Sequence, residues 1–265
     1  MEMYRYIRWL SLDIVLGAVV LLHYLGNFYS VTFPASVYLA LASAVWLIYT
    51  LDHLIDARKV ESPTSDRHRF HKKHLRTLQK ASMMVLMVAL VNVFFLPEVI
   101  IRNGTLLASA CTGYLLLVFL SRKRWVKEFW VALIYAMGIF LAPFSMGQMG
   151  GWDVFLLSQL ILIAFLNLII FSFYDHELDQ HDGFHSIVVR LGRKNSAIAI
   201  HGISLLTLAL TLTGWAISAQ QIELVFLLMS VALYNVFLFP VFFHRHERFR
   251  IVGDAVFFLP SAFLI

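Results

Sequence analysis

The sequence predicts an all-α polytopic membrane protein with about nine transmembrane helices. Of its 265 residues, 60% are hydrophobic and 14% are charged, whereas a soluble domain is nearer half apolar and a quarter charged. The apolar residues come in long blocks, as transmembrane helices require. No stretch shows the residue-by-residue alternation of a membrane β-barrel. We therefore expect one helical membrane domain over residues 1–265.

Each apolar block is expected to form one span, because about twenty apolar residues cross a bilayer as a helix. Two basic residues precede the first block, as in a signal peptide. That block is long and lacks a good cleavage site, so we interpret it as a retained helix. The ninth block is short and is either a partial span or a helix that ends with the chain. The nine blocks cover residues 7–28, 33–55, 78–97, 104–121, 129–147, 153–175, 197–216, 221–243 and 251–265.

The distribution of Lys and Arg predicts the orientation. If the nine spans alternate in direction, 20 of the 21 basic residues lie on one side and only Arg102 lies on the other. Because basic loops stay in the cytoplasm, we expect the N-terminus and the active site on the cytoplasmic side of a cytoplasmic (inner) membrane. This distribution explains the net charge of +5, so we expect no nucleic-acid partner. The single cysteine, Cys111, excludes a disulfide framework within one chain.

Two pairs of aspartates stand at the ends of two expected spans, both on the side predicted to be cytoplasmic. Asp52 and Asp56 close one apolar block, and Asp175 and Asp179 close another. A spacing of four residues places both carboxylates of a pair on one face of a helix. Mg²⁺ takes one or two carboxylates and completes its shell with water and substrate phosphates. The repeated layout indicates two related helical halves with a site between them.

Around these aspartates the sequence resembles the UbiA superfamily of intramembrane prenyltransferases. The resemblance extends over the whole chain in helix count, and it implies nine helices around a central cavity. The usual first motif of that family is Asn-Asp-x-x-Asp-x-x-x-Asp, and its first two positions fall on Ile48 and Tyr49 here. The best match is Asp175-x-x-x-Asp179-x-x-x-Gly183-x-x-Ser186, followed by Val188-Val189-Arg190-Leu191-Gly192-Arg193.

The resemblance implies a Mg²⁺-dependent transfer of a prenyl group from a polyprenyl diphosphate to a hydrophobic acceptor, aromatic or lipid, within the membrane lipid. The four aspartates Asp52, Asp56, Asp175 and Asp179 would be the catalytic metal ligands. Metal ions and basic side chains stabilise the charge that develops on a leaving pyrophosphate. The positions matching the basic residues of the family, and therefore expected to bind the diphosphate, are Arg67, Lys123, Arg124 and His185.

Two other functions remain open from the sequence. The apolar or aromatic residues at 48 and 49 are compatible with a member that binds or transports an isoprenoid diphosphate without turnover. A membrane di-iron desaturase or hydroxylase also gathers histidines on the cytoplasmic face, and imidazole suits iron. This chain has no His-His pair, and two lysines lie within its first histidine cluster. The clustered histidines are His68, His71, His74, His176, His181, His185, His244 and His246.

Overall fold

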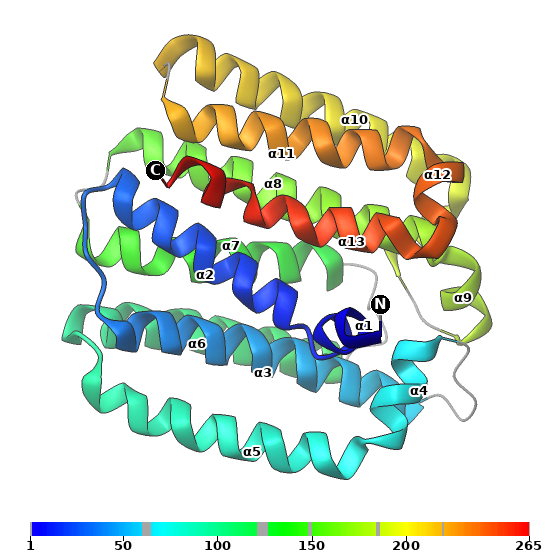
Figure 1. Cartoon of the computed structure of the whole chain (residues 1–265), viewed down its shortest axis with the longest axis horizontal. Helices are drawn as coiled ribbons and strands as arrows, with labels where there is room; N and C mark the ends of the chain where they lie inside the picture. The colour runs from blue at the N-terminus through cyan, green and yellow to red at the C-terminus, as the bar shows by residue number, and fades with distance from the viewer. Residues whose placement is uncertain are drawn as a thin grey trace.

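The structure is a computed structural model that describes residues 2–59, 65–120, 127–147, 150–183, 186–218 and 220–264. All regular secondary structure in these ranges is helical, which confirms the all-α class. Long helices lie side by side along one common direction, and short helices join them at one end (Figure 1).

Nine helical segments within the described ranges follow the nine predicted spans in order. Six of them are long and apolar enough to cross a membrane, namely α3, α5 with its 3-10 extension, α7, α8, α10 and α11. This composition is that of a multi-pass membrane protein. The nine are α2 (Leu12–Phe28), α3 (Ala35–Lys59), α5 (Leu75–Asn92), α6 (Glu98–Leu120), α7 (Lys127–Met146), α8 (Gly151–Tyr174), α10 (Ile187–Ser218), α11 (Gln221–Leu238), and α13 (Arg248–Ala255) continued by the 3-10 helix η4 (Val256–Phe263).

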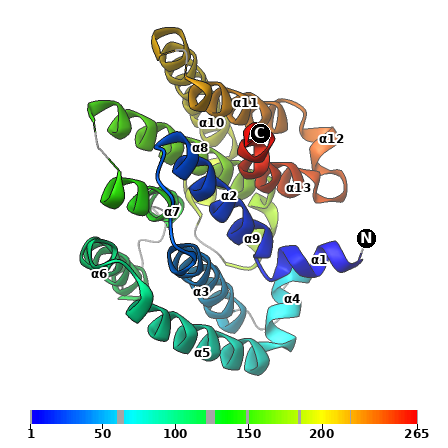
Figure 2. The same ribbon diagram turned by 60° about the vertical axis from the view of Figure 1, so that its left-hand side comes forward.

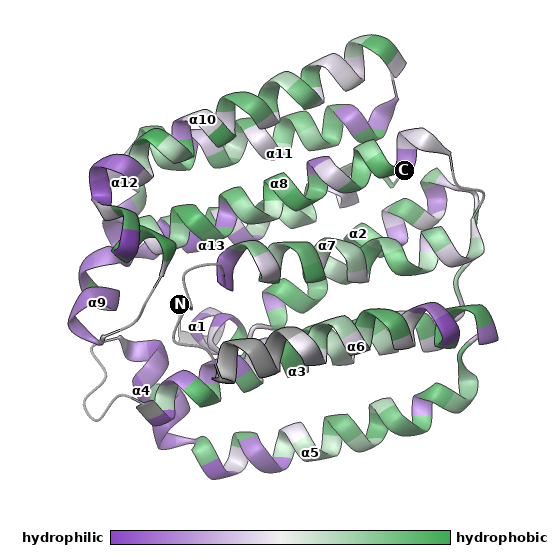
Figure 3. Ribbon diagram, turned by 180° about the vertical axis from the view of Figure 1, so that it is seen from behind, coloured by the Kyte–Doolittle hydropathy of each residue, from purple (hydrophilic) through white to green (hydrophobic). Residues whose placement is uncertain are grey.

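The short helices gather at one end of the molecule. Figure 3 shows that hydrophilic residues also concentrate there, whereas the long helices are mostly hydrophobic. This is the end expected to face the cytoplasm, since the long basic segments connect the spans there. The short elements at this end are α1 (Glu2–Trp9), α4 (Asp66–Lys73), α9 (His176–His181), α12 (Pro240–His244) and the 3-10 helix η3 (Arg245–Glu247), whereas η1 (Val93–Phe95) extends α5 at the other end.

Helix α8 forms the centre of the bundle and α5 forms its edge. Half of the most apolar window of α8 is buried, against 17% for α5. Helix α8 contacts α7, α10 and α11, and its Leu156, Leu160 and Ile163 are fully buried. Helix α5 packs beside α3 (Figure 2) and exposes apolar side chains such as Met84 and Leu90. Exposed apolar residues on a peripheral helix are what a lipid environment favours.

Two glycines with positive φ angles shape the segment after α9. Gly183 (φ 71°) lies in the turn that follows α9. Gly192 (φ 76°, ψ 156°) interrupts α10 and separates its first turn from the predicted span 197–216. Both backbone conformations favour glycine, since a side chain at positive φ is strained. The chain therefore reaches α10 through a short helical turn near the second Asp pair.

Candidate active site

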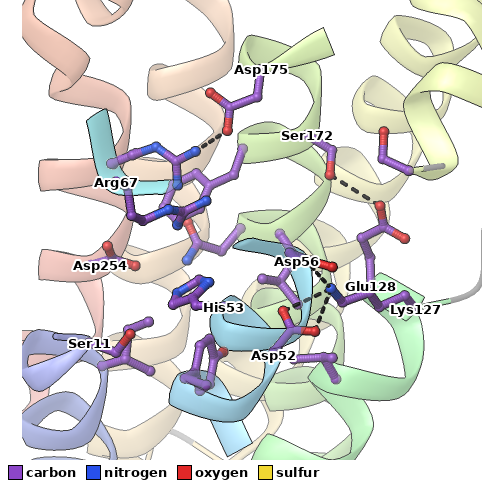
Figure 4. A pocket seen from close by; sticks show the side chains of 18 of the residues that line it. Ser11, Asp52, His53, Asp56, Arg67, Lys127, Glu128, Ser172, Asp175 and Asp254 are labelled. Carbon is purple, nitrogen blue, oxygen red and sulfur yellow. Dashed lines mark hydrogen bonds and ion pairs between the residues drawn. The ribbon is translucent and has the colours of Figure 1, made fainter. Parts of the chain in front are cut away.

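A cavity of about 260 Å³ opens at the polar end of the bundle between α3, α4, α7, α8 and α13. Side chains from both Asp pairs line it, so the structure brings together two motifs far apart in sequence (Figure 4). Its polar part carries eight carboxyl and four basic side chains, namely Asp52, Asp56, Glu128, Asp175, Asp179, Asp182, Glu247 and Asp254, with Arg8, Arg67, Lys127 and Arg250. Its apolar wall includes Ile14, Ala132, Tyr135, Ala164, Leu168, Phe171 and Phe257.

The first Asp pair shares a lysine. Asp52 and Asp56 lie in the last turns of α3, and Lys127 is the first residue of α7. The Lys127 ammonium lies 2.6 Å from Asp52 Oδ1 and 2.8 Å from Asp52 Oδ2. It also donates to Asp56 Oδ2 at 3.3 Å. Figure 4 shows the ammonium pointing between the two carboxylates. A single cation therefore bridges the pair.

The neighbouring Glu128 fixes the start of α7 to two other helices. Its carboxylate oxygen Oε1 accepts a hydrogen bond from the hydroxyl of Ser172 at 3.1 Å. The same oxygen accepts one from the backbone N–H of Ile187 at 3.0 Å. Glu128 is buried, and hydrogen bonds to a buried charged group are among the stronger ones in proteins. This anchoring holds Lys127 at the first Asp pair.

The second Asp pair spans a break between two helices. Asp175 ends α8 and Asp179 lies on α9, while the N–H of Asp179 still donates to the carbonyl of Asp175 at 2.8 Å. The guanidinium of Arg250, from α13, hydrogen-bonds the carboxylate of Asp175. The hydroxyl of Ser186 is hydrogen-bonded to Asp179. The basic group therefore bonds only one of the two carboxylates, unlike the lysine at the first pair.

The charge of Asp179 is poorly compensated. Burial and, to a smaller extent, the nearby Asp175 carboxylate raise the pKa of the Asp179 carboxyl to about 7. The positive charge of Arg250 acts in the opposite direction but does not cancel these effects. Two close carboxylates with insufficient neutralisation form a site that favours a cation.

Helix α4 carries Arg67 into the space between the pairs. Ser65 caps this helix, because its hydroxyl accepts from the N–H of His68 at 3.2 Å. Burial lowers the pKa of Arg67 to about 10, and the charge of Arg250 contributes to this effect. The carboxylates of the second pair and of Asp52 favour its charged form, so Arg67 is cationic at neutral pH. The other predicted diphosphate-binding residues, Lys123, Arg124 and His185, lie outside the described residues.

The histidines of α4 are neutral side chains within the same region. Burial, followed by the charge of Arg67, lowers the pKa of His68 to about 4. His71 Nδ1 lies 2.9 Å from the backbone carbonyl of Arg67. Within the described ranges, no three His, Cys, Asp or Glu side chains are arranged to hold one metal ion. The part of the chain that the structure describes thus offers no ligand set for a di-iron centre.

Solved structures with this architecture come from two archaea. A UbiA homologue from Archaeoglobus fulgidus bound to DMAPP and Mg²⁺ matches with a TM-score of 0.62 and 17% identity, over 97% of this chain and 98% of that chain. A UbiA homologue from Archaeoglobus fulgidus bound to GPP and Mg²⁺ matches with a TM-score of 0.65 and 16% identity, over the same shares of the two chains. An apo UbiA homologue from Aeropyrum pernix K1 matches with a TM-score of 0.68, 14% identity and 96% of both chains.

The chain has the UbiA fold. The resemblance noted from the sequence is thus confirmed at the level of fold, over nearly the whole length. No protein-family profile matches the sequence. No curated protein matches it either. At sequence identities of 14–17%, this chain and the solved structures share their fold. Because a fold does not determine function, the function is inferred from the residues in the cavity.

Several cavity residues of this UbiA fold were not singled out from the sequence. Lys127 and Arg250 were counted only as basic residues that set the orientation. Glu128 and Asp254 were not considered at all, although an acidic residue within or beside an apolar block is itself a signal of function. Asp13, within the first apolar block, is another such acid, and the structure buries it.

The two Asp pairs differ in how well they fit Mg²⁺. At the second pair, Arg250 bonds Asp175 while Asp179 also lines the cavity, and Mg²⁺ needs only one or two carboxylates together with water and phosphate oxygens. At the first pair, the ammonium of Lys127 already lies between the carboxylates. A divalent ion about 4 Å from an ammonium would be repelled by roughly 8 kcal/mol at an effective dielectric constant of about 20. Asp175 and Asp179 therefore fit the metal, and Asp52 and Asp56 do not while Lys127 remains.

Proposed function

We propose that this protein transfers a prenyl group from a polyprenyl diphosphate to a hydrophobic acceptor in a Mg²⁺-dependent reaction. One observation carries the proposal. Both Asp pairs and the buried Arg67 meet in a single cavity whose other wall is apolar. The fold adds support, because UbiA homologues with this architecture are known bound to DMAPP or GPP with Mg²⁺.

The polar part of the cavity would hold the diphosphate. Asp175 and Asp179 would bind Mg²⁺, which neutralises charge on the diphosphate and on the leaving pyrophosphate. Arg67 can make bidentate contacts with phosphate oxygens, and we assign it the role of clamping the diphosphate. Lys123, Arg124 and His185 lie outside the described residues, and we propose that they add positive charge at the diphosphate.

The apolar wall would hold the isoprenoid tail and keep water away from the reacting carbon. The bond between C1 of the prenyl chain and the bridging oxygen breaks, and pyrophosphate leaves with the electron pair. The allylic cation is then captured by the acceptor, which loses a proton. Aromatic rings attract cations, and Tyr49, Tyr135, Phe171 and Phe257 line the cavity. We place this site on the cytoplasmic side of a cytoplasmic membrane, following the basic loops.

A second candidate is a protein that binds the diphosphate without turnover. The contact of Lys127 with Asp52 and Asp56 favours this candidate, because the ammonium occupies the place where a catalytic metal ion would bind these carboxylates. The two candidates predict the same ligand and differ only in the release of pyrophosphate.

The test is pyrophosphate release by the purified protein in detergent. The substrate is farnesyl or geranylgeranyl diphosphate, supplied with Mg²⁺ and a pool of aromatic and lipid acceptors. We expect release that stops with EDTA and with Asp179→Ala. Glu177→Ala is the matched control, since it removes an exposed carboxylate from the same helix, one that contacts Arg193 outside the cavity. Binding without release supports the second candidate, and absence of both contradicts the proposed function.

A further inference from the structure

The two Asp pairs hold their cations in different ways. At the first pair, three carboxylate oxygens lie within 3.3 Å of the Lys127 nitrogen. An ammonium has three N–H donors, so the number of oxygens matches the number of donors. At the second pair, the guanidinium of Arg250 bonds the carboxylate of Asp175. The first pair is thus arranged around one point charge, whereas at the second pair Arg250 bonds Asp175 and the hydroxyl of Ser186 is hydrogen-bonded to Asp179.

The position of Lys127 is built into the fold. It begins α7, and the next residue, Glu128, ties that helix start to Ser172 of α8 and to the N–H of Ile187. The ring of Phe129 packs edge-on against Phe165 at 5.7 Å. Three consecutive residues therefore fix the register of this turn. Moving the ammonium out of the first pair would require its long side chain to leave two carboxylates uncompensated.

The first pair also has few further oxygen ligands to offer. The residue one helical turn before Asp52 is Ile48, which has no donor atom. Lys127 thus contacts both carboxylates of the first pair, whereas Arg250 bonds the carboxylate of Asp175. A metal ion at the first pair would have to displace a cation from both of its ligands.

We propose that Lys127 serves as a permanent cation at the first Asp pair, so that the cavity takes a single Mg²⁺, at Asp175 and Asp179. This inference rests on the proposed function, because it concerns the same diphosphate site. Lys127 would then face the diphosphate with a charge that the chain itself supplies. Each chain would then require one divalent metal ion.

The experiment counts bound Mn²⁺ by electron paramagnetic resonance, with Mn²⁺ in place of Mg²⁺. The purified full chain in detergent is titrated in the presence of farnesyl thiodiphosphate, whose bridging sulfur resists cleavage. We expect one Mn²⁺ per chain for the wild type. We expect two for Lys127→Met, because the vacated carboxylates become a metal site. Lys194→Met, an exposed lysine of α10 outside the cavity, is the matched control and should keep one.

A second pair of variants keeps the test decisive if Lys127→Met does not fold. Asp52→Asn combined with Asp56→Asn should still bind one Mn²⁺, whereas Asp175→Asn combined with Asp179→Asn should bind none. Two Mn²⁺ ions in the wild type, or loss of the ion in the first double variant, would overturn the assignment of Lys127. An unchanged count of one in a folded Lys127→Met protein would also overturn it. Absence of Mn²⁺ and of thiodiphosphate binding in the wild type would instead contradict the proposed function.

Discussion

The two Asp-x-x-x-Asp segments look alike in sequence and differ in structure. Asp52 and Asp56 lie within one continuous helix, α3, and share Lys127. Asp175 and Asp179 lie on either side of a helix break, and Arg250 bonds the carboxylate of Asp175. The difference teaches that identical spacing of ligands does not ensure an identical site. The properties of each site depend on the basic side chain that another segment of the chain places beside the pair.

The largest expected effect separates the two pairs directly. Asp179→Asn should weaken Mg²⁺-dependent binding of farnesyl thiodiphosphate by about 100-fold, because it removes a metal ligand. Asp52→Asn should weaken it by only about 10-fold, because the main loss is the positioning of Lys127. Isothermal titration calorimetry in detergent measures both. Equal losses for the two variants would mean that the pairs are equivalent, against our comparison.

A double-mutant cycle should show that Lys127 is coupled to the first pair alone. The coupling free energy between Asp52→Asn and Lys127→Met is expected to be about 1–3 kcal/mol, as for residues that share an ion-pair network. The cycle between Asp175→Asn and Lys127→Met should give less than about 0.5 kcal/mol. Unfolding in detergent followed by circular dichroism supplies the four free energies. A similar coupling in both cycles would contradict the separation of the pairs.

The anchor of α7 should contribute less. Glu128→Gln keeps the shape of the side chain and removes the charge that Ser172 and Ile187 hydrogen-bond. We expect a loss of about 1–2 kcal/mol in the free energy of unfolding. Binding of the thiodiphosphate should weaken slightly as well, because Lys127 is held less firmly. Thermal unfolding of Glu128→Gln measures this loss, and Glu177→Gln, which changes an exposed carboxylate, is the control. An unchanged stability would contradict the role of Glu128 as the anchor of α7.

A pH-dependent effect concerns helix α4, which lies between the pairs. The folded state holds the pKa of His68 at about 4, below the ordinary value near 6.5. Between pH 6.5 and 4, His68 is therefore protonated in the unfolded chain but neutral in the folded chain. The free energy of unfolding falls as the pH falls through this window. His68→Gln should make stability less dependent on pH in this window, because the difference in bound protons between the unfolded and folded chains falls by at most one. Melting temperatures between pH 7 and pH 4.5 test it, with His74→Gln as the control.

Much of the fold follows from the sequence because the bilayer restricts the possible structures. Backbone groups in lipid must bond within their own segment, so long apolar blocks become helices. The predicted blocks 33–55 and 221–243 correspond to α3 and α11 within a few residues. The short helix α4 was not predicted, because it is too polar to resemble a span and too short to show a clear period.

The cavity was predictable only in part. The spacing of the Asp pairs identified four of its acids, and the resemblance to the UbiA family implied Arg67. The roles of Lys127 and Arg250 were hidden, because a basic residue at the edge of a span normally sets the orientation. Their contacts depend on how α7 and α13 pack against α3 and α8, and such packing leaves no periodic trace in one sequence. Asp254 was missed for the same reason.

The most direct test of the inequality between the pairs is a crystal structure with Mn²⁺ and farnesyl thiodiphosphate. Anomalous scattering locates the metal independently of how the side chains are built. We expect one peak beside Asp175 and Asp179, with the ammonium of Lys127 still between Asp52 and Asp56. A peak between Asp52 and Asp56, with Lys127 displaced, would contradict it.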